Sequence, residues 1–309
     1  MAKILVTGGW GFIGTNLTNE LRSRGHNVYT LDILQGHHPQ HYKADTGEFQ
    51  QLEAIFRAHE SEPFDFVYHL AAEYGRWNGE DHYQNLWRTN VVGTKNILRL
   101  QERYRFKHIF FSSAEVYGDY DGLMSEDVME RIPIQQMNDY AISKWAGELQ
   151  CLNHADMFDV DVVRVRPVNC YGPHEYYSRY RGVIPIFVYK ALHKEPFMVY
   201  RGHHRIFDYV DDTARTFANI VDNFIPGEVY NVGSHEDWEV TIEDLAKVVI
   251  DVTGADSGLV EVKGEEAFTT HDKKMDFSKI RRDLDHKATI DLEEGVRRYA
   301  EWMRKVYEV

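Results

Sequence analysis

The start of the chain alternates apolar and polar stretches in the order strand, turn, helix, strand. Residues 3–7 form a β-branched, apolar run typical of a buried strand, and a glycine-rich segment, residues 8–14, follows it. In residues 15–24 the leucines lie four positions apart on one helical face. Residues 27–31 are a second apolar run that ends on Asp32. The pattern predicts one βαβ unit of about thirty residues.

The same alternation of short apolar runs and amphipathic stretches continues to Pro167. Predicted strands and predicted helices alternate along this part of the chain. The strands are 66–70, 108–113 and 161–166, and the helices are 50–59, 86–103 and 140–153. Strands that alternate with helices predict an α/β fold built on a doubly wound parallel sheet of the Rossmann type.

Beyond residue 167 the pattern becomes richer in loops, with shorter elements between them. Helices are predicted at 183–192, 211–223, 241–252 and 292–306, and a strand at 229–231. We therefore expect a cofactor-binding domain at 1–167 and a smaller C-terminal substrate-binding lobe at 168–309, with the two lobes interleaved.

The net charge limits the classes of partner that we expect, and the cysteine content indicates the cellular compartment. A formal net charge of -14, spread along the chain, argues against nucleic acid or an anionic membrane as partner. Two cysteines provide no disulfide framework and suit a reducing cytosol. No apolar run is long enough to cross a bilayer, and none at the start resembles a signal peptide. The sequence predicts a cytoplasmic protein without a membrane partner.

The glycine-rich segment has the physical features of a dinucleotide site. Gly8 permits a tight turn, Gly11 permits close approach of the backbone to a pyrophosphate, and Gly14 permits close packing of helix and strand. Asp32 lies where a carboxylate accepts hydrogen bonds from a ribose 2′-hydroxyl and repels a 2′-phosphate, which favours NAD over NADP. The expected cofactor-binding residues are Gly8, Gly11, Phe12, Ile13, Gly14, Asp32, Asp45, Leu70, Ala71, Ala72, Tyr140 and Lys144.

A tyrosine and a lysine four residues apart lie in the predicted helix 140–153. An ammonium group and a cationic nicotinamide near the phenol of Tyr140 are expected to lower its pKa from about 10 towards neutrality. Tyr140 can then take a proton from a substrate alcohol, and Lys144 supplies the charge. Ser113, at the end of a predicted strand, can hydrogen-bond the same alcohol.

Together these motifs resemble the extended short-chain dehydrogenase/reductases of the nucleotide-sugar epimerase/dehydratase family. The resemblance extends over nearly the whole chain. It is carried by residues 7–14 (TGGWGFIG), 69–72 (HLAA), 89–94 (TNVVGT), 112–118 (SSAEVYG), 140–144 (YAISK), 166–173 (RPVNCYGP), 205–212 (RIFDYVDD) and 231–233 (NVG).

The resemblance implies a role for individual residues. Ser113, Tyr140 and Lys144 would form the catalytic triad, while Asn169 and Arg205 resemble residues that bind the substrate diphosphate. The chain carries Lys273 and Lys274 where family members usually have a further Arg. The expected substrate contacts are Arg76, Ser113, Asn169, Val183, Arg205 and Lys273. Members are typically homodimers joined through the helices that correspond to 86–103 and 140–153.

Glu115 bears on the choice of reaction. Oxidation of a sugar at C4 acidifies the C5 hydrogen, and a carboxylate two residues beyond Ser113 can remove it. Family 4,6-dehydratases and UDP-glucuronate decarboxylases carry Glu at this position, whereas simple 4-epimerases usually do not and often have Ala before it. Here Ala114 precedes Glu115, which mixes the two patterns. The alternative to this catalytic role is that Glu115 is a solvated loop acid.

Two further features stay open at the level of sequence. Arg76 and Trp77 depart from the small polar residues that family members carry, and they either contact the sugar or its phosphate or pack over the cleft. The paired histidines at 37–38 and 203–204 lack any spacing that completes a metal site, so no metal is expected.

The resemblance implies an NAD-dependent enzyme that acts on a nucleoside-diphosphate sugar through a transient 4-keto intermediate. Epimerisation at C4 or C5 is slightly favoured. The alternatives are 4,6-dehydration with Glu115 as the C5 base, decarboxylation of the UDP-glucuronate type, 4-reduction or ring rearrangement. A protein that binds NAD or nucleotide sugars as a sensor, without catalysis, is the alternative from another class.

Overall fold

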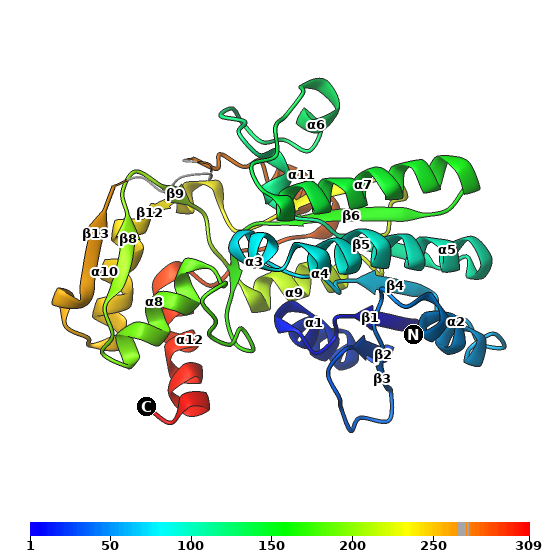
Figure 1. Ribbon diagram of the computed structural model, residues 1–309, viewed down its shortest axis with the longest axis horizontal. Helices are drawn as coiled ribbons and strands as arrows, with labels where there is room; N and C mark the ends of the chain where they lie inside the picture. The colour runs from blue at the N-terminus through cyan, green and yellow to red at the C-terminus, as the bar shows by residue number, and fades with distance from the viewer. Residues whose placement is uncertain (265–269, 271) are drawn as a thin grey trace.

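A computed structural model describes residues 1–264, 270 and 272–309. Within these residues seven strands form one parallel sheet, in the order β11-β6-β5-β4-β1-β2-β3 (Figure 1). The strands are β1 (Lys3–Thr7), β2 (Asn27–Asp32), β3 (His41–Lys43), β4 (Phe66–His69), β5 (Lys107–Phe111), β6 (Val162–Pro167) and β11 (Val229–Val232). The order reverses beside β1, as in a doubly wound fold, so the predicted fold class is confirmed.

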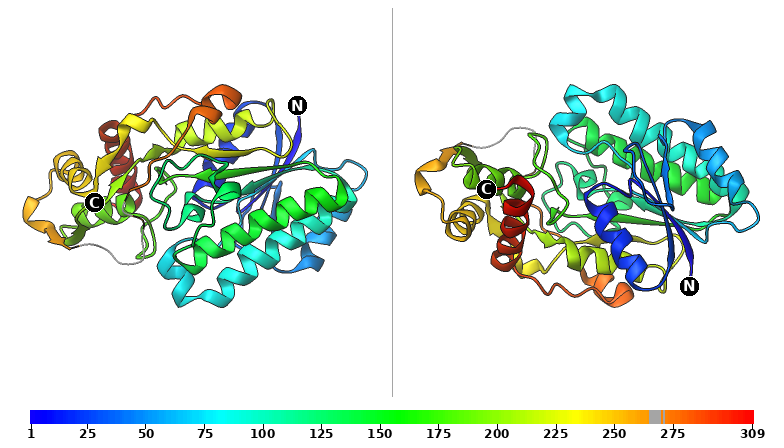
Figure 2. Two further views of the ribbon diagram at one scale, coloured as in Figure 1. Left: turned by 90° about the horizontal axis from the view of Figure 1, so that it is seen from above. Right: turned by 90° about the horizontal axis from the view of Figure 1, so that it is seen from below.

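Helices cover both faces of this sheet (Figure 2). One face carries α1, α9 and α11, and the other carries α2, α5 and α7. Their bounds are α1 (Phe12–Ser23), α2 (Phe49–Ala58), α5 (Thr94–Tyr104), α7 (Asp139–Phe158), α9 (Val210–Asn219) and α11 (Ser278–Leu284). Both faces are buried, which explains why the strands are apolar runs and do not alternate with polar residues.

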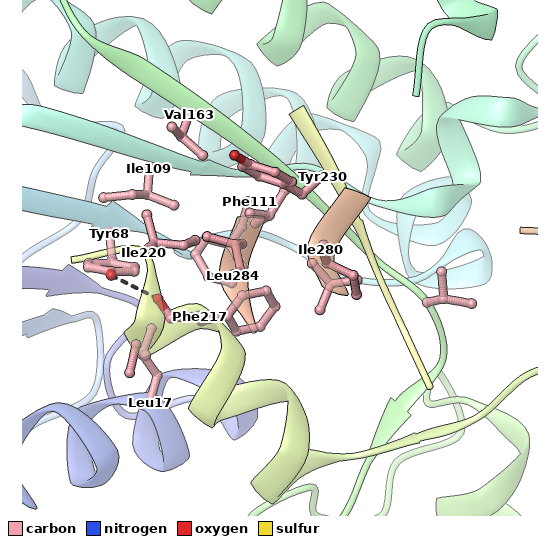
Figure 3. Close-up of a cluster of buried hydrophobic side chains, with 14 of the residues drawn as sticks. Leu17, Tyr68, Ile109, Phe111, Val163, Phe217, Ile220, Tyr230, Ile280 and Leu284 are labelled. Atoms are coloured by element: carbon pink, nitrogen blue, oxygen red, sulfur yellow. Dashed lines mark hydrogen bonds between the residues drawn. The ribbon is translucent and has the colours of Figure 1, made fainter. Parts of the chain in front are cut away.

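The alternation of side chains along each strand divides the core between the two faces. Ile4 of β1 packs with the cluster under α1 and α9, whereas Leu5 packs with the cluster under α2 and α5. Figure 3 shows the first cluster, in which the Tyr68 hydroxyl donates a hydrogen bond of 2.9 Å to the Phe217 carbonyl. This bond joins β4 to α9, so the second half of the chain helps to hold the sheet.

The strand expected at 229–231 does not belong to the smaller lobe. As β11 it pairs in parallel with β6, with Val229 opposite Arg164, and it forms one edge of the main sheet. Two helices from beyond residue 167, α9 and α11, also pack on this sheet. The physical reason is that apolar periodicity predicts a strand but carries no information about which distant edge it joins.

The helix expected at 86–103 is divided into three consecutive helical segments. They are α4 (Tyr83–Trp87), a π-helical turn η1 (Arg88–Gly93) and α5. Inside the π-turn, the buried Asn90 amide donates to the Glu73 carbonyl at 3.1 Å and to Ser143 Oγ at 2.9 Å. The widened turn therefore ties the loop after β4 to α7, next to the cavity described below.

The smaller lobe packs three helices around its own apolar cluster, at one end of the molecule (Figure 1). They are α8 (Val183–Leu192), α10 (Ile242–Thr253) and α12 (Leu292–Tyr307), close to their predicted bounds. The remaining short elements are β7 (Cys170–Tyr171), β8 (Phe197–Tyr200), β9 (His204–Arg205), β10 (Asp208–Tyr209), β12 (Val240–Thr241), β13 (Val260–Lys263), α3 (Arg76–Asp81), α6 (Val128–Arg131), η2 (Ala114–Tyr117), η3 (Glu236–Trp238) and η4 (Ser257–Leu259). Over the described residues, no helix combines the length and apolarity needed to span a bilayer.

Candidate active site

A cavity of about 550 Å³ lies along the carboxyl ends of the sheet strands, where open α/β sheets bind ligands. Its wall contains every residue that the sequence predicted for the cofactor. These are Gly8, Gly11, Phe12, Ile13, Gly14, Asp32, Asp45, Leu70, Ala71, Ala72, Tyr140 and Lys144. Ser113, Glu115, Asn169 and Lys273 line the same cavity.

The turn between β1 and α1 has no room for a side chain at Gly8, nor has the first turn of α1 at Gly14. Gly8 has φ +66°, and a Cβ on it would lie 2.8 Å from the Ala71 nitrogen. A Cβ on Gly14 would lie 2.1 Å from the Gly8 carbonyl oxygen. The N–H groups in the first turn of α1, beside Gly11, therefore lie at the cavity wall without a side chain from the glycines to cover them. This cradle fits the pyrophosphate of a dinucleotide.

The two expected nucleotide carboxylates have different surroundings. Asp32, at the end of β2, accepts hydrogen bonds from the backbone nitrogens of Trp10 at 3.0 Å and Leu34 at 3.1 Å. It is thereby held at the cavity wall, where a ribose would lie. Asp45 instead pairs with Arg88 at 2.7 Å, so its expected contact with adenine stays a prediction.

The expected catalytic residues converge from β5 and α7. Helix α7 begins with an Asn138 cap that accepts a hydrogen bond from the Ala141 nitrogen at 2.9 Å, which places Tyr140 in the first turn. Ser113 follows β5 and hydrogen-bonds the Tyr140 side chain. Lys144 lies one turn along α7, where its ammonium group donates to the Phe111 carbonyl at 2.8 Å.

The residues of the chain do not produce the expected lowering of the pKa of Tyr140. Burial raises that pKa above its usual value and outweighs the hydrogen bond from Ser113, which acts in the opposite direction. Burial also lowers the pKa of Lys144 to about 7, and its Nζ lies 5.9 Å from the centre of the Tyr140 ring. The protein alone therefore keeps the phenol protonated at neutral pH, and the predicted lowering by Lys144 together with a cationic nicotinamide stays a prediction.

Glu115 and Lys273, which are far apart in the sequence, form an ion pair. Burial alone would raise the pKa of Glu115, but the positive charges of Lys273, Arg205 and Arg76 outweigh it and lower that pKa. Burial lowers the pKa of Lys273, against the attraction of Glu115. Glu115 is therefore an ionised, paired carboxylate and not a solvated loop acid.

A second cavity of about 410 Å³ adjoins the first and extends towards α8. Three expected substrate residues, Arg76, Val183 and Arg205, line it. Tyr140 and Asn169 line both cavities, so the phenol lies where they meet. This arrangement can hold a cofactor in the first cavity and a substrate in the second, with one reacting group between them.

Two of the expected diphosphate contacts also make bonds within the protein. Arg205 donates to the His204 carbonyl at 2.8 Å and to the Thr270 carbonyl at 2.6 Å. Asn169, in the left-handed region at φ +37°, donates to the Ile206 carbonyl at 2.9 Å. These bonds orient both side chains at the cavity wall, and their contact with a diphosphate remains a prediction.

Arg76 and Trp77 both line the second cavity, and the Arg76 guanidinium lies 4.9 Å from the centre of the Trp77 ring. Among the residues that the structure describes, no group of three or more His, Cys, Asp or Glu side chains is arranged to hold a metal ion. One of the paired histidines, His204, hydrogen-bonds Asp272 at 2.8 Å.

Four residues at the junction of the cavities were not predicted as site residues. They are Tyr74, Cys170, Glu175 and Arg181, which line both cavities. The Tyr74 and Tyr140 rings are in edge-to-face contact, with centres 5.7 Å apart. Tyr74 lies in the segment whose composition departs from that of the family, and this departure could have indicated Tyr74 as a site residue. Glu175 and Arg181 lie in a polar loop, where a charged residue usually indicates a solvated surface.

Comparison with known proteins supports the family resemblance of the sequence motifs over nearly the whole chain. The family model described as "NAD dependent epimerase/dehydratase family" matches residues 4–233. The chain is 30% identical to the UDP-N-acetyl-alpha-D-glucosaminuronate decarboxylase of Bacillus cytotoxicus, with 98% of both chains covered. It is 28% identical to the dTDP-D-glucose 4,6-dehydratase of Homo sapiens, covering 98% of this chain and 90% of the human one.

Among solved structures, the UDP-glucose 4-epimerase of Thermotoga maritima with UDP-glucose is similar to this chain, with a TM-score of 0.89. The two are 26% identical, and the match covers 99% of each chain. These three proteins carry three different reactions on similar chains. The similarity therefore identifies the kind of chemistry and leaves the particular reaction to the details of the site.

Proposed function

Because the chain belongs to the NAD dependent epimerase/dehydratase family, we propose that it modifies a nucleoside-diphosphate sugar through transient oxidation at C4. NAD is the cofactor of this family, and the glycine cradle of β1 and α1 fits it. The observation that carries the proposal is the position of Tyr140, hydrogen-bonded to Ser113 at the junction of the two cavities.

In the proposed reaction Tyr140 accepts the proton of the C4 hydroxyl, and Ser113 hydrogen-bonds the same oxygen. Bound NAD supplies a hydride acceptor and a cationic ring. Since burial raises the pKa of Tyr140, proton transfer depends on positive charge brought next to the phenol. Lys144, one helical turn away, adds to that charge when it is protonated.

The ion pair between Glu115 and Lys273 supports epimerisation at C4 over reactions at C5. Removal of the C5 proton requires a free carboxylate, whereas Glu115 is paired and its pKa is lowered by three cations, despite burial. A carboxylate with a lowered pKa is a weaker base. Epimerisation at C4 requires no such base, because hydride leaves one face of C4 and returns to the other.

The second candidate is 4,6-dehydration, which the position of Glu115 favours. Its carboxylate lines both cavities, two residues beyond Ser113. If substrate displaced Lys273, Glu115 would be free to remove the C5 proton. The human relative in the comparison is named as an enzyme of this reaction.

One experiment separates these candidates. NAD-loaded protein is incubated with a panel of nucleotide sugars, and product masses and the absorbance near 340 nm are measured. Epimerisation predicts a product of unchanged mass, and dehydration predicts loss of one water. No absorbance change and no product with any sugar would contradict the proposal and support a binding protein without catalysis.

The variant Glu115→Gln provides a second way to distinguish C4 epimerisation from dehydration. For C4 epimerisation we expect it to retain activity within about tenfold, since it loses a charge but no reacting group. For dehydration we expect it to lose elimination of water while NAD is still reduced. Tyr140→Phe is the control, because it removes the proton acceptor and should abolish NAD reduction in both cases.

A further inference from the structure

Arg181 presents an unmatched positive charge to the place where the two cavities meet. It lies in the loop between β7 and α8 and lines both cavities. Within residues 1–264, 270 and 272–309, its guanidinium group has no hydrogen-bond or ion-pair partner. The guanidinium lies over the ring of Tyr74, whose centre is 5.4 Å away. A half-buried guanidinium with this much unused donor capacity is suited to an anionic ligand.

Glu175, on the same loop, is the second unmatched group. The residue is 3% exposed and lines both cavities, and its Oε2 atom has no hydrogen-bond partner in the described structure. The titratable groups that face it are Tyr74, Cys170, Arg181 and, from α12, Tyr299. Burial raises the pKa of Glu175 to about 8, although Arg181 acts in the opposite direction. At neutral pH its carboxyl group is mostly protonated and can donate a hydrogen bond.

Arg181 lies close to the reacting end of the site. It lines the junction of the cavities together with Tyr140, and the Tyr74 ring under its guanidinium group is in contact with the Tyr140 ring. Burial raises the pKa of Tyr140, and the charge of Arg181 acts against that shift. By contrast, Lys273 is already paired with Glu115.

We propose that Arg181 and Glu175 together bind a carboxylate on the sugar, so that the substrate is a nucleoside-diphosphate uronic acid. A planar guanidinium offers two parallel donors and a protonated carboxyl offers one more, which matches the acceptor positions of a carboxylate. The inference rests on the proposed function, because it places the sugar in the second cavity beside Tyr140.

The charge of the second cavity supports an acidic sugar over a neutral one. Apart from Arg179, which pairs with Asp81, four of the described residues that line it are cationic, and two, Glu115 and Glu175, carry carboxyl groups. The four cations are Arg76, Arg181, Lys190 and Arg205. This local excess of positive charge occurs in a chain of net charge -14. A diphosphate alone leaves the charge of Arg181 unmatched, whereas a sugar carboxylate balances it.

The test is calorimetric titration of NAD-loaded protein with UDP-glucuronate and UDP-glucose at pH 7. We expect UDP-glucuronate to bind at least about tenfold more tightly. Arg181→Met should abolish this preference and change the affinity for UDP-glucose by less than about threefold. Arg179→Met is the matched control. It removes a cation from the same loop, but one that pairs with Asp81 and has a side chain 73% exposed, so the preference should remain.

The pH dependence gives a second, independent readout. As pH rises through the pKa of Glu175, its carboxyl group loses the proton that it donates and repels the sugar carboxylate, so the preference should fall between pH 7 and pH 9. Tyr74 and Cys170 stay protonated in this range, because burial raises both of their pKa values. Glu175→Gln keeps a neutral donor at this place and should keep the preference at pH 9.

Four outcomes would overturn the inference. They are equal affinity for the two sugars, tighter binding of UDP-glucose, binding of neither, and a preference that survives Arg181→Met. The proposed function fails by a different result, which is the absence of any NAD reduction or product on the whole panel of nucleotide sugars. An enzyme that turns over neutral sugars without preference would keep the proposed function and exclude the uronic acid.

Discussion

Glu148 supports the catalytic residues from inside the protein. It lies on α7, one turn beyond Lys144, with its side chain fully buried. It accepts two hydrogen bonds of 2.8 Å from Arg166, one of 3.2 Å from Arg164 and one of 2.5 Å from Ser112, the neighbour of Ser113. Burial alone would raise the pKa of Glu148, but the two arginines outweigh it and lower that pKa. The carboxylate is therefore ionised and fixes the end of β5 against α7.

We expect Glu148→Gln to lower the free energy of unfolding by about 3–5 kcal/mol, because it leaves Arg166 buried without its counter-charge. Denaturant unfolding measures this change. The pKa of Glu148 is depressed in the folded state, so its stabilisation is complete above the unfolded value of about 4.3 and is lost as pH falls through the folded value. The variant should lose less stability in acid than the native protein.

Glu294→Gln is the matched control for this prediction. Glu294 also pairs with two arginines, but on the surface of α12, where water screens such pairs and their contribution to stability is small. A loss at Glu148 as small as the loss at Glu294 would contradict a structural role for the buried cluster.

Site residues differ in how far they follow from the sequence. Tyr140 and Lys144 were predictable, because a spacing of four residues places both side chains on one face of a helix. The ion pair of Glu115 with Lys273 was not, since 158 residues separate the partners and no local pattern links them. The raised pKa of Tyr140 also could not be predicted, because burial depends on the packing of both lobes.

The turn between β1 and α1 is the element on which cofactor binding depends. Its glycines bring Gly14 of α1 close to the backbone of Gly8 and Gly9, and bring Gly8 close to the backbone of the loop after β4. We expect Gly14→Ala to weaken NAD binding at least about tenfold, because a Cβ 2.1 Å from the Gly8 carbonyl forces the turn open. Calorimetric titration with NAD measures the loss.

Gly25→Ala provides the control at the other end of the same helix. Gly25 has φ +81°, and no atom lies within 4 Å of the place that a Cβ would take, so the substitution adds strain but no clash. We expect a loss of stability of about 1 kcal/mol with unchanged affinity for NAD. If both variants bound NAD normally, the glycine cradle would not be the phosphate site.

Elements defined by local pattern were predicted well, and those defined by distant pairing were not. The βαβ unit at the start and helices α8, α10 and α12 lie close to their expected bounds. Two of the features that differ have a tertiary cause. The π-turn at Arg88–Gly93 is joined to α7 and to the loop after β4 through Asn90, and β11 finds its partner more than sixty positions earlier in the chain.

At the scale of the whole molecule, the outer surface of η1 and α7 carries exposed apolar side chains. Val92 is 48% exposed, Ile142 38% and Leu149 48%. The corresponding helices join family members into homodimers, as the resemblance implies, and this surface is suited to the same use. The association of two copies stays a prediction for this chain.

We expect Leu149→Glu to convert a dimer into a monomer, because it places a charge in the centre of an apolar contact. Sedimentation velocity at micromolar concentration measures the change. Met198→Glu, at an exposed apolar position of β8 in the smaller lobe, should leave the dimer intact. A native protein that sediments as a monomer would exclude this interface.

The central claim is that hydride leaves C4 of the sugar and returns to it within one cycle, with Tyr140 as the proton acceptor. The most direct measurement uses the nucleotide sugar found active in the panel, deuterated at C4, with product analysis by mass spectrometry and NMR. We expect the label to remain in the product, a slower turnover than with the unlabelled sugar, and no turnover by Tyr140→Phe. Loss of the label to solvent, or full activity of Tyr140→Phe, would contradict the claim.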